Sequence, residues 1–598
     1  MLFASIFIPP RLSLFSFTGT EKRQKTADMR CAIWHVQTPR SPLISNCRRC
    51  PKWQAACLSL SNNMCLRSSE ACCAFRPPIC PTLSSSISRR KSWSLNPQFN
   101  LELIDEKSMI TLKDIRKGHP FGFSSATDTD YVRIANTVYD MLRYISFCAR
   151  RTDEEMKRMA IKLTLYFEDI VSEIGLWRSF VHLHQSLYGK PLPFYYTGMG
   201  YTENEPNIYD IQYLLWDATL DDEDSETLVN PENEALAYAA RTVYAYFMEL
   251  FEDTPINDDL YDFFHEARFT DNFYEVRQVL KWYFFDCYLT SGRFRESTFS
   301  EALDYQMDLC RGNRQVAQSA AEASIAFRYQ VGPLALKPQE WLSALLTVRG
   351  HADESAAVAA VVAKDLEPYV LERYDRQTVT LRSVDDELMT VRRTPNFQVQ
   401  TTLLKSPDTE GCVGSYAQYD DEWYLNGMNT WGDILRLIPE YKKERDIERN
   451  ATFGDLATDA RSALHSRQLF FFATPEAYEA FYHDELKMPQ GSKASLPRGV
   501  KNILLFIPNL AEGKLCTIMD CAEYICHPDN PMYNKEKAKS HFLISDLDHV
   551  PGEFIRYAIT HHLMPDFALN SNQGYARGRQ LAQENLDFLA RTLRRQDY

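Results

Sequence analysis

The chain has 598 residues, of which 45% are hydrophobic and 24% charged, the balance of an ordinary globular protein. This length exceeds what one hydrophobic core supports, so we expect about two to four domains. Residues 1–108 hold 15 Lys and Arg against six Asp and Glu, whereas the rest holds 51 against 74, and this net charge of −23 argues against general nucleic-acid binding.

Residues 1–108 also contain eight of the 15 cysteines, and three interpretations compete for them. A targeting segment would be rich in Arg and Ser, as this stretch is. A zinc or disulfide module would use the cysteines, but Cys47-Arg-Arg-Cys50 has no second matching pair. We favour a disordered or non-native leader with Met109 as the natural start, because no segment combines a hydrophobic period with helix caps.

Residues 109–365 form the first predicted domain, which is helical. Apolar residues recur at spacings of three and four and so share one helix face, namely Tyr131, Ile134, Val138, Leu142 and Ile145. A second helix follows Thr152, and Asn230-Pro231-Glu232 is a suitable entry to a later one.

Residues 366–430 change to a period of two, which indicates strands. Val379 and Leu381 alternate with polar residues before a turn at Asp385-Asp386, and a second hairpin turns at Tyr419-Asp420-Asp421. Four or five such strands predict a small, SH3-like β-barrel. Gly427 is expected to end its last strand.

A helical linker is predicted over 431–466, and a C-terminal α/β-type module over 467–598. Thr474 and Pro475 have the residue types of a helix N-terminus. Buried strands are predicted at 468–473, 501–507 and 515–519, with helices around 551–562 and 578–595. The fold class is therefore multi-domain α+β, with a helical domain, a small barrel and an α/β-type tail.

Motifs of known chemistry are absent from the sequence. It contains no phosphate-binding Gly-x-x-x-x-Gly-Lys loop, no Gly-x-Ser-x-Gly elbow and no His-Glu-x-x-His. After Met109 no apolar stretch reaches the roughly 18–20 residues that span a bilayer. The sparse cysteines of this part fit a reducing compartment, so we predict a cytoplasmic protein.

Cys516, Cys521 and Cys526 with His527 are the most metal-like set. Their spacing approaches that of zinc ligands, but they divide between a strand and a helix, which favours structural cysteines. His561-His562 with Asp566 is a weaker candidate, since adjacent helical residues diverge. We predict no metal and no cofactor.

His182 and His184 stand two residues apart on a helix, so one is expected to be buried and the other exposed. The acidic run 221–226 lacks the glycine of a calcium loop and is expected to be a solvated loop. Asp169 and Glu173 could serve as paired carboxylates. On a helix whose other face is apolar, we expect them to face solvent.

Several stretches together resemble an uncharacterised family of large bacterial proteins, mainly from the Bacteroidetes. The resemblance runs from about Met109 to the C-terminus and implies no activity, ligand or catalytic residue. The stretches that carry it are Tyr166–Trp177, Leu187–Phe194, Asp210–Trp216, Gly414-Ser-Tyr, Trp423–Gly427, Leu504–Asn509 and Pro528–Tyr533.

We favour a non-enzymatic binding or scaffolding protein whose partner is a protein or a peptide. Small barrels present aromatic faces to ligands, which makes Tyr416, Trp423 and Tyr424 the candidate binding residues. One alternative is a metal-dependent hydrolase that uses the C-terminal Cys and His residues. Another is a structural subunit of a larger complex, with the aromatic-rich helices as its interface.

Overall fold

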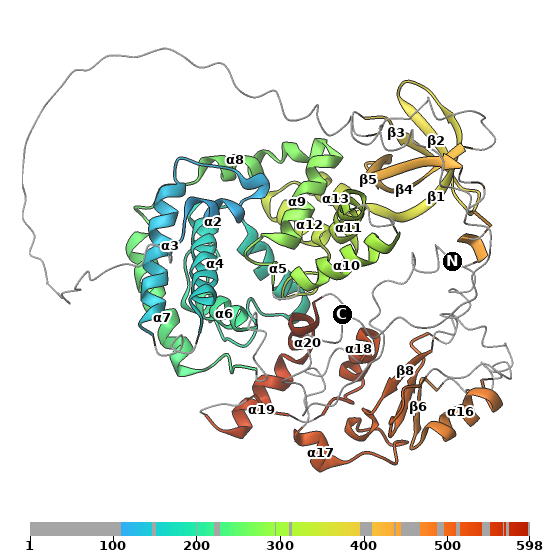
Figure 1. Ribbon diagram of the computed structural model, residues 1–598. Coiled ribbons are helices and arrows are strands. Elements are labelled where there is room, and N and C mark those ends of the chain that lie inside the picture. The colour runs from blue at the N-terminus through green and yellow to red at the C-terminus, as the bar shows by residue number, and fades with distance from the viewer. Residues whose placement is uncertain are drawn as a thin grey trace, which may run out of the picture. The chain divides into compact units, whose positions relative to one another are not determined.

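A computed structural model describes the chain from Met109 to Tyr598 (Figure 1). The predicted leader, residues 1–108, lies outside the described residues. So do 146–150, 199, 221–227, 293–294, 310–313, 395–396, 398–409, 434, 436–437, 440, 444–463, 465–466, 487–495, 510–514, 541–549, 566, 570–572 and 596–597. None of the helices in the described part has the length and hydrophobicity of a membrane-spanning segment.

The first part of the described chain is helical, in agreement with the sequence. Its α-helices are α2 (Leu112–Lys117), α3 (Asp128–Arg143), α4 (Asp153–Val171), α5 (Leu176–Tyr188), α6 (Ile208–Thr219), α7 (Glu234–Leu250), α8 (Asp258–Glu266), α9 (Phe273–Phe285), α10 (Arg295–Leu309), α11 (Arg314–Arg328), α12 (Pro338–Arg349) and α13 (Ala352–Ala359). Two 3₁₀ turns join them, η2 (Pro120–Gly122) and η4 (Arg268–Asp271).

Side-chain caps explain where several of these helices begin. The Thr152 hydroxyl accepts the Glu155 N–H while the Glu155 carboxylate accepts the Thr152 N–H, which forms a capping box before α4. The side chains of Asn207, Asn233 and Asn272 accept backbone N–H groups of the first turn and so cap α6, α7 and α9. The five apolar residues predicted to share one face of α3 and its C-terminal turn are all buried.

The predicted small barrel is confirmed as a closed five-stranded barrel in the order β1-β2-β3-β5-β4. Its strands are β1 (Val362–Tyr374), β2 (Thr378–Arg382), β3 (Leu388–Arg392), β4 (Glu410–Tyr419) and β5 (Glu422–Asp433). All neighbours are antiparallel except β3 and β5, which pair in parallel through Val391 and Trp423. This one parallel contact closes the barrel.

The predicted turn of the β4–β5 hairpin is also present. Tyr419 pairs with Glu422, and the two residues between them, Asp420 and Asp421, have φ values of 49° and 60°. Two consecutive positive φ angles match the right-handed twist of the flanking strands, and Asp tolerates them better than most residues. Asp420 and Asp421, which the sequence predicted as a turn, therefore also set the register of the hairpin.

The end of the barrel differs from the expectation. β5 does not stop at Gly427 but continues to Asp433, and Gly427 lies within it at a φ of 112°. A strand irregularity lies opposite, where the register shifts between Gly414 and Tyr416. Trp431, predicted as the start of a helix, is therefore a strand residue of the barrel core. Most of the predicted helical linker lies outside the described residues.

The C-terminal part contains the predicted strands, but they form an antiparallel sheet. β6 (Leu469–Phe472), β7 (Ile503–Phe506) and β8 (Cys516–Met519) pair in that order, so this part is α+β rather than α/β. Thr474 caps α16 (Pro475–Asp484) as predicted. The 3₁₀ turn η6 (Ala522–Tyr524) and the helices α17 (Lys535–Ser540) and α18 (Gly552–Thr560) follow.

The last predicted helix is divided into α19 (Tyr575–Glu584) and α20 (Leu586–Arg594), and both pack into the core of the helical part. Phe588 lies edge-on to His184, Tyr188 and Phe194. Asn585 accepts hydrogen bonds from the Lys190 ammonium at 2.7 Å and from the Phe194 N–H at 3.0 Å. The end of the chain thus completes a core that begins almost 480 residues earlier, at Ile110.

Replacement of Phe588 by Leu tests this closure. The substitution keeps most of the apolar volume but removes the edge-to-face ring contacts, so we expect unfolding to become easier by about 1–2 kcal/mol. Urea unfolding followed by tryptophan fluorescence measures the change. Tyr575→Leu is the matched control because this side chain is 62% exposed at the start of α19, and we expect less than about 0.5 kcal/mol.

Candidate functional site

A cavity of about 650 Å³ opens between α2, the first half of α4 and the turn from α9 to α10. We call it the charged cleft. Its buried members are Lys162, Leu165 and Tyr288, which form the floor. Its exposed members form the rim and carry both signs of charge, with Lys117, Glu154, Arg158 and Glu296 among them. Ligand sites of small molecules have volumes of roughly 300–1,000 Å³.

Helix α4 supplies one wall of the charged cleft. Arg158, Ile161, Lys162 and Leu165 line it, and their spacings of three, one and three place them on one helix face. Every residue of α4 from Lys162 to Val171 is buried, so the polar side chains in this half need partners inside the protein. Lys162 and Tyr166 reach acids of α6, whereas Glu168 and Asp169 reach other parts of the helical domain.

Lys162 extends to a buried ion triad under the floor. Its ammonium donates to one carboxylate oxygen of Asp217, on α6, and Arg595 donates to the other at 3.1 Å. Burial alone would raise the pKa of Asp217, but the two cations hold it below its ordinary value. Because buried ion pairs rarely stabilise more than apolar residues of similar size would, the triad is weak evidence for added stability.

Asp169, one turn beyond Leu165 on α4, holds the floor residue Tyr288 in place. Its carboxylate accepts the N–H groups of Gly175, Leu176 and Trp177, at 2.8, 3.0 and 2.6 Å, and the Tyr288 hydroxyl at 2.7 Å. Burial raises the pKa of the Asp169 carboxyl group, while these four donors oppose that rise. One acid thus fixes the start of α5 and the position of Tyr288.

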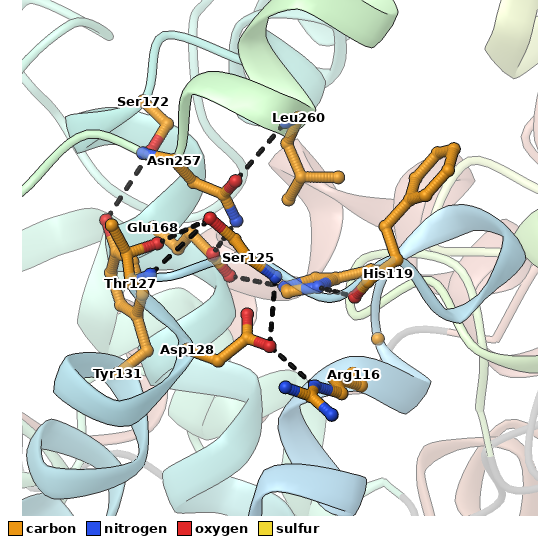
Figure 2. Close-up of polar contacts among 12 residues, drawn as sticks. Arg116, His119, Ser125, Thr127, Asp128, Tyr131, Glu168, Ser172, Asn257 and Leu260 are labelled. Carbon is orange, nitrogen blue, oxygen red and sulfur yellow. Dashed lines mark hydrogen bonds and ion pairs between the residues drawn. The ribbon is translucent and has the colours of Figure 1, made fainter. Parts of the chain in front are cut away.

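Glu168, its neighbour, holds the turn after α2 in place (Figure 2). One carboxylate oxygen lies 2.9 Å from His119 Nε2, and the other accepts the Asn257 amide at 2.7 Å. His119 Nδ1 lies 3.0 Å from the carbonyl oxygen of Phe123, which can only accept. Nε2 and the carboxylate must therefore share a second proton. Burial alone would lower the pKa of His119, but Glu168 raises it above 6.5.

Figure 2 also shows the polar contacts at the start of α3 that lie beside this pair. Asp128, at the start of α3, accepts the Arg116 guanidinium at 2.6 Å and the Ser125 N–H at 3.1 Å. Tyr131 donates to the Pro255 carbonyl group, and Ser172 accepts the Asn257 N–H. Arg116 and His119 flank Lys117 and Gly118, which line the cleft. The buried network therefore fixes the α2 wall.

A further acid, Asp210 at the start of α6, is fully buried outside the cleft. It accepts the hydroxyl groups of Tyr166 at 2.9 Å and Tyr201 at 3.0 Å. Burial raises the pKa of Asp210 to about 8, since two neutral donors compensate only part of the lost hydration. This carboxyl group therefore holds a proton in the folded protein well above the pH at which a hydrated one loses it.

The residues expected to bind a ligand on the barrel lie in three different environments. Tyr416 is fully buried inside the barrel, where its ring meets Tyr369 and Phe397, so it is not available at the surface. Tyr424 is half-buried and stacks on Phe273 of α9. Trp423 is half-buried with the Lys364 ammonium 5.6 Å from its ring centre. Of the three, Trp423 is the one that remains for a barrel ligand.

Asp169 and Glu173 were both expected to face solvent. This is wrong for Asp169, which is buried, and right for Glu173, which is exposed. The helix face opposite the apolar stripe is covered because α4 packs against α2, α3, α5 and α6. The histidine pair follows the expectation, with His182 exposed and His184 buried. Burial lowers the pKa of His184 to about 4.

The metal-like residues do not converge where the structure describes them. Cys516 and Cys521 are buried in the core beside the C-terminal sheet, and Cys526 is exposed. Within the described ranges, no group of three or more His, Cys, Asp or Glu residues could hold a metal ion. Asp566 and the acidic run 221–226 lie outside those ranges.

Lys162, Asp217, Tyr288 and Arg595 were not singled out from the sequence. A charged residue on a helix face that is otherwise apolar, such as Lys162, is the one signal that could have been used.

Comparison with known protein families gives a match. The model of a family described as "Protein of unknown function (DUF3843)" matches residues 110–398 and 424–595. No curated protein and no solved structure matches the chain. The two matched segments include every described residue that forms the floor of the charged cleft and the ion triad beneath it.

Proposed function

We propose that this protein, which belongs to the DUF3843 family of unknown function, binds a small, polar, charged ligand in the charged cleft. The observation that carries the proposal is an open cavity of about 650 Å³ above a buried ion triad. A binding role agrees with the sequence-based preference for a binding protein over an enzyme. The cytoplasmic location remains a prediction.

The lining favours a charged ligand over an apolar one. Cationic groups on the walls, including Arg158 and Arg295, alternate with Glu154, Asp286 and Glu296. Several of these groups are only loosely paired with each other: Lys117 lies 3.6 Å from Asp286, and Arg295 lies 3.9 Å from Glu296. Long, partly exposed pairs of this kind contribute little to stability, so a ligand can replace them at small cost.

The walls are also held in place before a ligand arrives. Glu168, Asp169 and Asp217 each fasten a different wall or floor element through buried hydrogen bonds. Preorganised groups lose little conformational entropy on binding, which increases affinity. The buried acids therefore serve the binding site by fixing its shape.

Charge reversal at Arg158 tests the proposal. We expect a panel of polar carboxylates, phosphates and amino acids to include compounds that raise the melting temperature of the wild-type protein. We expect Arg158→Glu to reduce their effect at least about tenfold in apparent affinity, since it replaces an attraction in the cleft by a repulsion.

Lys157→Glu is the matched control. It makes the same change of net charge one residue away on α4, where the side chain does not line the cleft. Equal responses of the two variants to every stabilising compound would contradict the proposal.

The predicted protein or peptide partner of the barrel is a separate proposal. It depends on Trp423, whose half-buried ring lies beside Lys364 on the barrel wall. Trp423→Ala should weaken capture of such a partner and leave ligand binding in the charged cleft unchanged.

A further inference from the structure

Lys162 and its partners form an arrangement that a structural ion pair does not require. The Lys162 side chain is only 10% exposed, yet it lines the charged cleft. Its counter-ion, Asp217, is already paired with a second cation, Arg595, through the other carboxylate oxygen. Two cations therefore share one buried carboxylate at the floor of an open cavity.

Arg595 also has an unused donor. Its Nη1 atom is buried and has no hydrogen-bond partner among the described residues, whereas Nη2 donates to Asp217. The guanidinium lies directly behind Gly292, a lining residue, and leaves no room there for a β-carbon. Burying an unpaired donor of a charged group is costly, so a second arrangement that uses it is favoured.

From these contacts, and resting on the proposed function, we propose that the Lys162 ammonium releases Asp217 and binds an oxyanion of the ligand instead. When the ammonium turns to a carboxylate or phosphate oxygen in the cleft, Arg595 keeps Asp217 compensated. Its free Nη1 allows a two-point guanidinium–carboxylate contact, which is the strongest geometry for such a pair. The ligand is thus a small molecule with an oxyanion at one end.

The surroundings of the floor agree with this orientation. Lys162 is the one ionisable group with a buried side chain among the charged residues lining the cleft, and Asp217 lies behind it. The acidic lining residues Asp114, Glu154, Glu155, Asp286 and Glu296 are half-buried or exposed, toward the rim. An anionic group is therefore best placed at the floor, with hydrogen-bonding groups of the ligand at the rim, whose cations, Arg158 among them, also attract the anion.

Direct binding of two probes, inorganic phosphate and acetate, to the full-length protein tests the inference. Calorimetric titration of the wild type should show a single site for at least one probe, and the tighter probe identifies the oxyanion class. Lys162→Met should weaken binding at least about tenfold. Lys157→Met, which removes the same charge outside the cleft, should leave it unchanged.

Asp217→Asn separates this inference from a purely structural role. It removes the competitor for Lys162, so the probe should bind several-fold more tightly in a variant that melts cooperatively. If Asp217→Asn unfolds, Arg595→Met provides a second readout. Arg595→Met should weaken probe binding, because Lys162 is then the one cation left to compensate Asp217 and is less free to turn to the probe.

Unchanged probe binding in Lys162→Met overturns the inference, as does weaker binding in folded Asp217→Asn. Failure of both probes to bind the wild type also overturns it. In each case the proposed function is judged separately, by whether Arg158→Glu and Lys157→Glu differ in their response to the ligand panel.

Discussion

Glu168→Ala is expected to destabilise the protein by about 3–5 kcal/mol, because it leaves the buried imidazole of His119 and the amide of Asn257 without their shared acceptor. Urea unfolding followed by tryptophan fluorescence measures the loss. Glu249→Ala is the control, since Glu249 is exposed on α7, and we expect a change below about 0.5 kcal/mol. A loss below about 1 kcal/mol in Glu168→Ala would show that the network is dispensable.

The same pair has a pH signature. The pKa of His119 in the folded protein is raised above its ordinary value, so its stabilising contribution is present below about pH 6.5 and is lost as pH rises through the folded pKa. Glu168→Gln keeps an acceptor for Asn257 and offers a neutral donor to His119. We therefore expect this variant to lose less stability than Glu168→Ala and to lack this part of the alkaline decline.

Asp210→Asn, in contrast to Glu168→Ala, is expected to make the protein more stable at neutral and alkaline pH. The folded-state pKa of Asp210 is about 8, whereas an unfolded Asp titrates near 4, so the folded state holds an extra proton between these values. Stability of the wild type therefore falls as pH rises across this window, with a slope of up to about 1.4 kcal/mol per pH unit from this group. Asparagine resembles the protonated acid and removes that slope.

Unfolding free energies of both proteins at pH values from 4 to 8 give the comparison. We expect the two to be similar at the acid end and the variant to be increasingly more stable toward pH 8. A constant difference across the range would mean that Asp210 is ionised in the folded protein. The difference between the two curves isolates this residue, since all other titrating groups are shared.

The local features of the fold were predictable because they depend on neighbouring residues. Thr152 and Thr474 cap helices through their own side chains, and the Asp420-Asp421 turn sets a hairpin by its own backbone angles. The barrel strands were recognised from their period of two. Gly427 was misjudged because a glycine within a strand can mark an irregularity as well as an end.

The site was not predictable because its contacts join distant parts of the chain. Lys162 and Asp217 are 55 residues apart, Asp169 and Tyr288 are 119 apart, and Asp217 and Arg595 are 378 apart. Periodicity predicted that one face of α4 is buried but not that neighbouring helices enclose the other. Asp169 was therefore assigned to the surface, although its burial is what positions Tyr288.

The split of the last helix has a similar cause. The apolar residues of 578–595 predicted one amphipathic helix, but the chain breaks at Asn585, whose side chain accepts hydrogen bonds from Lys190 and Phe194. This tertiary contact also brings Arg595 to Asp217. The ion triad beneath the charged cleft therefore depends on the docking of α20.

The most direct test of ligand binding in the charged cleft is equilibrium dialysis of the full-length protein against a cellular extract of small molecules, followed by mass spectrometry. We expect wild type and Lys157→Glu both to retain the same small oxyanion-bearing compound and Arg158→Glu not to retain it. Retention of the same compounds by all three proteins, or of none by the wild type, would contradict it.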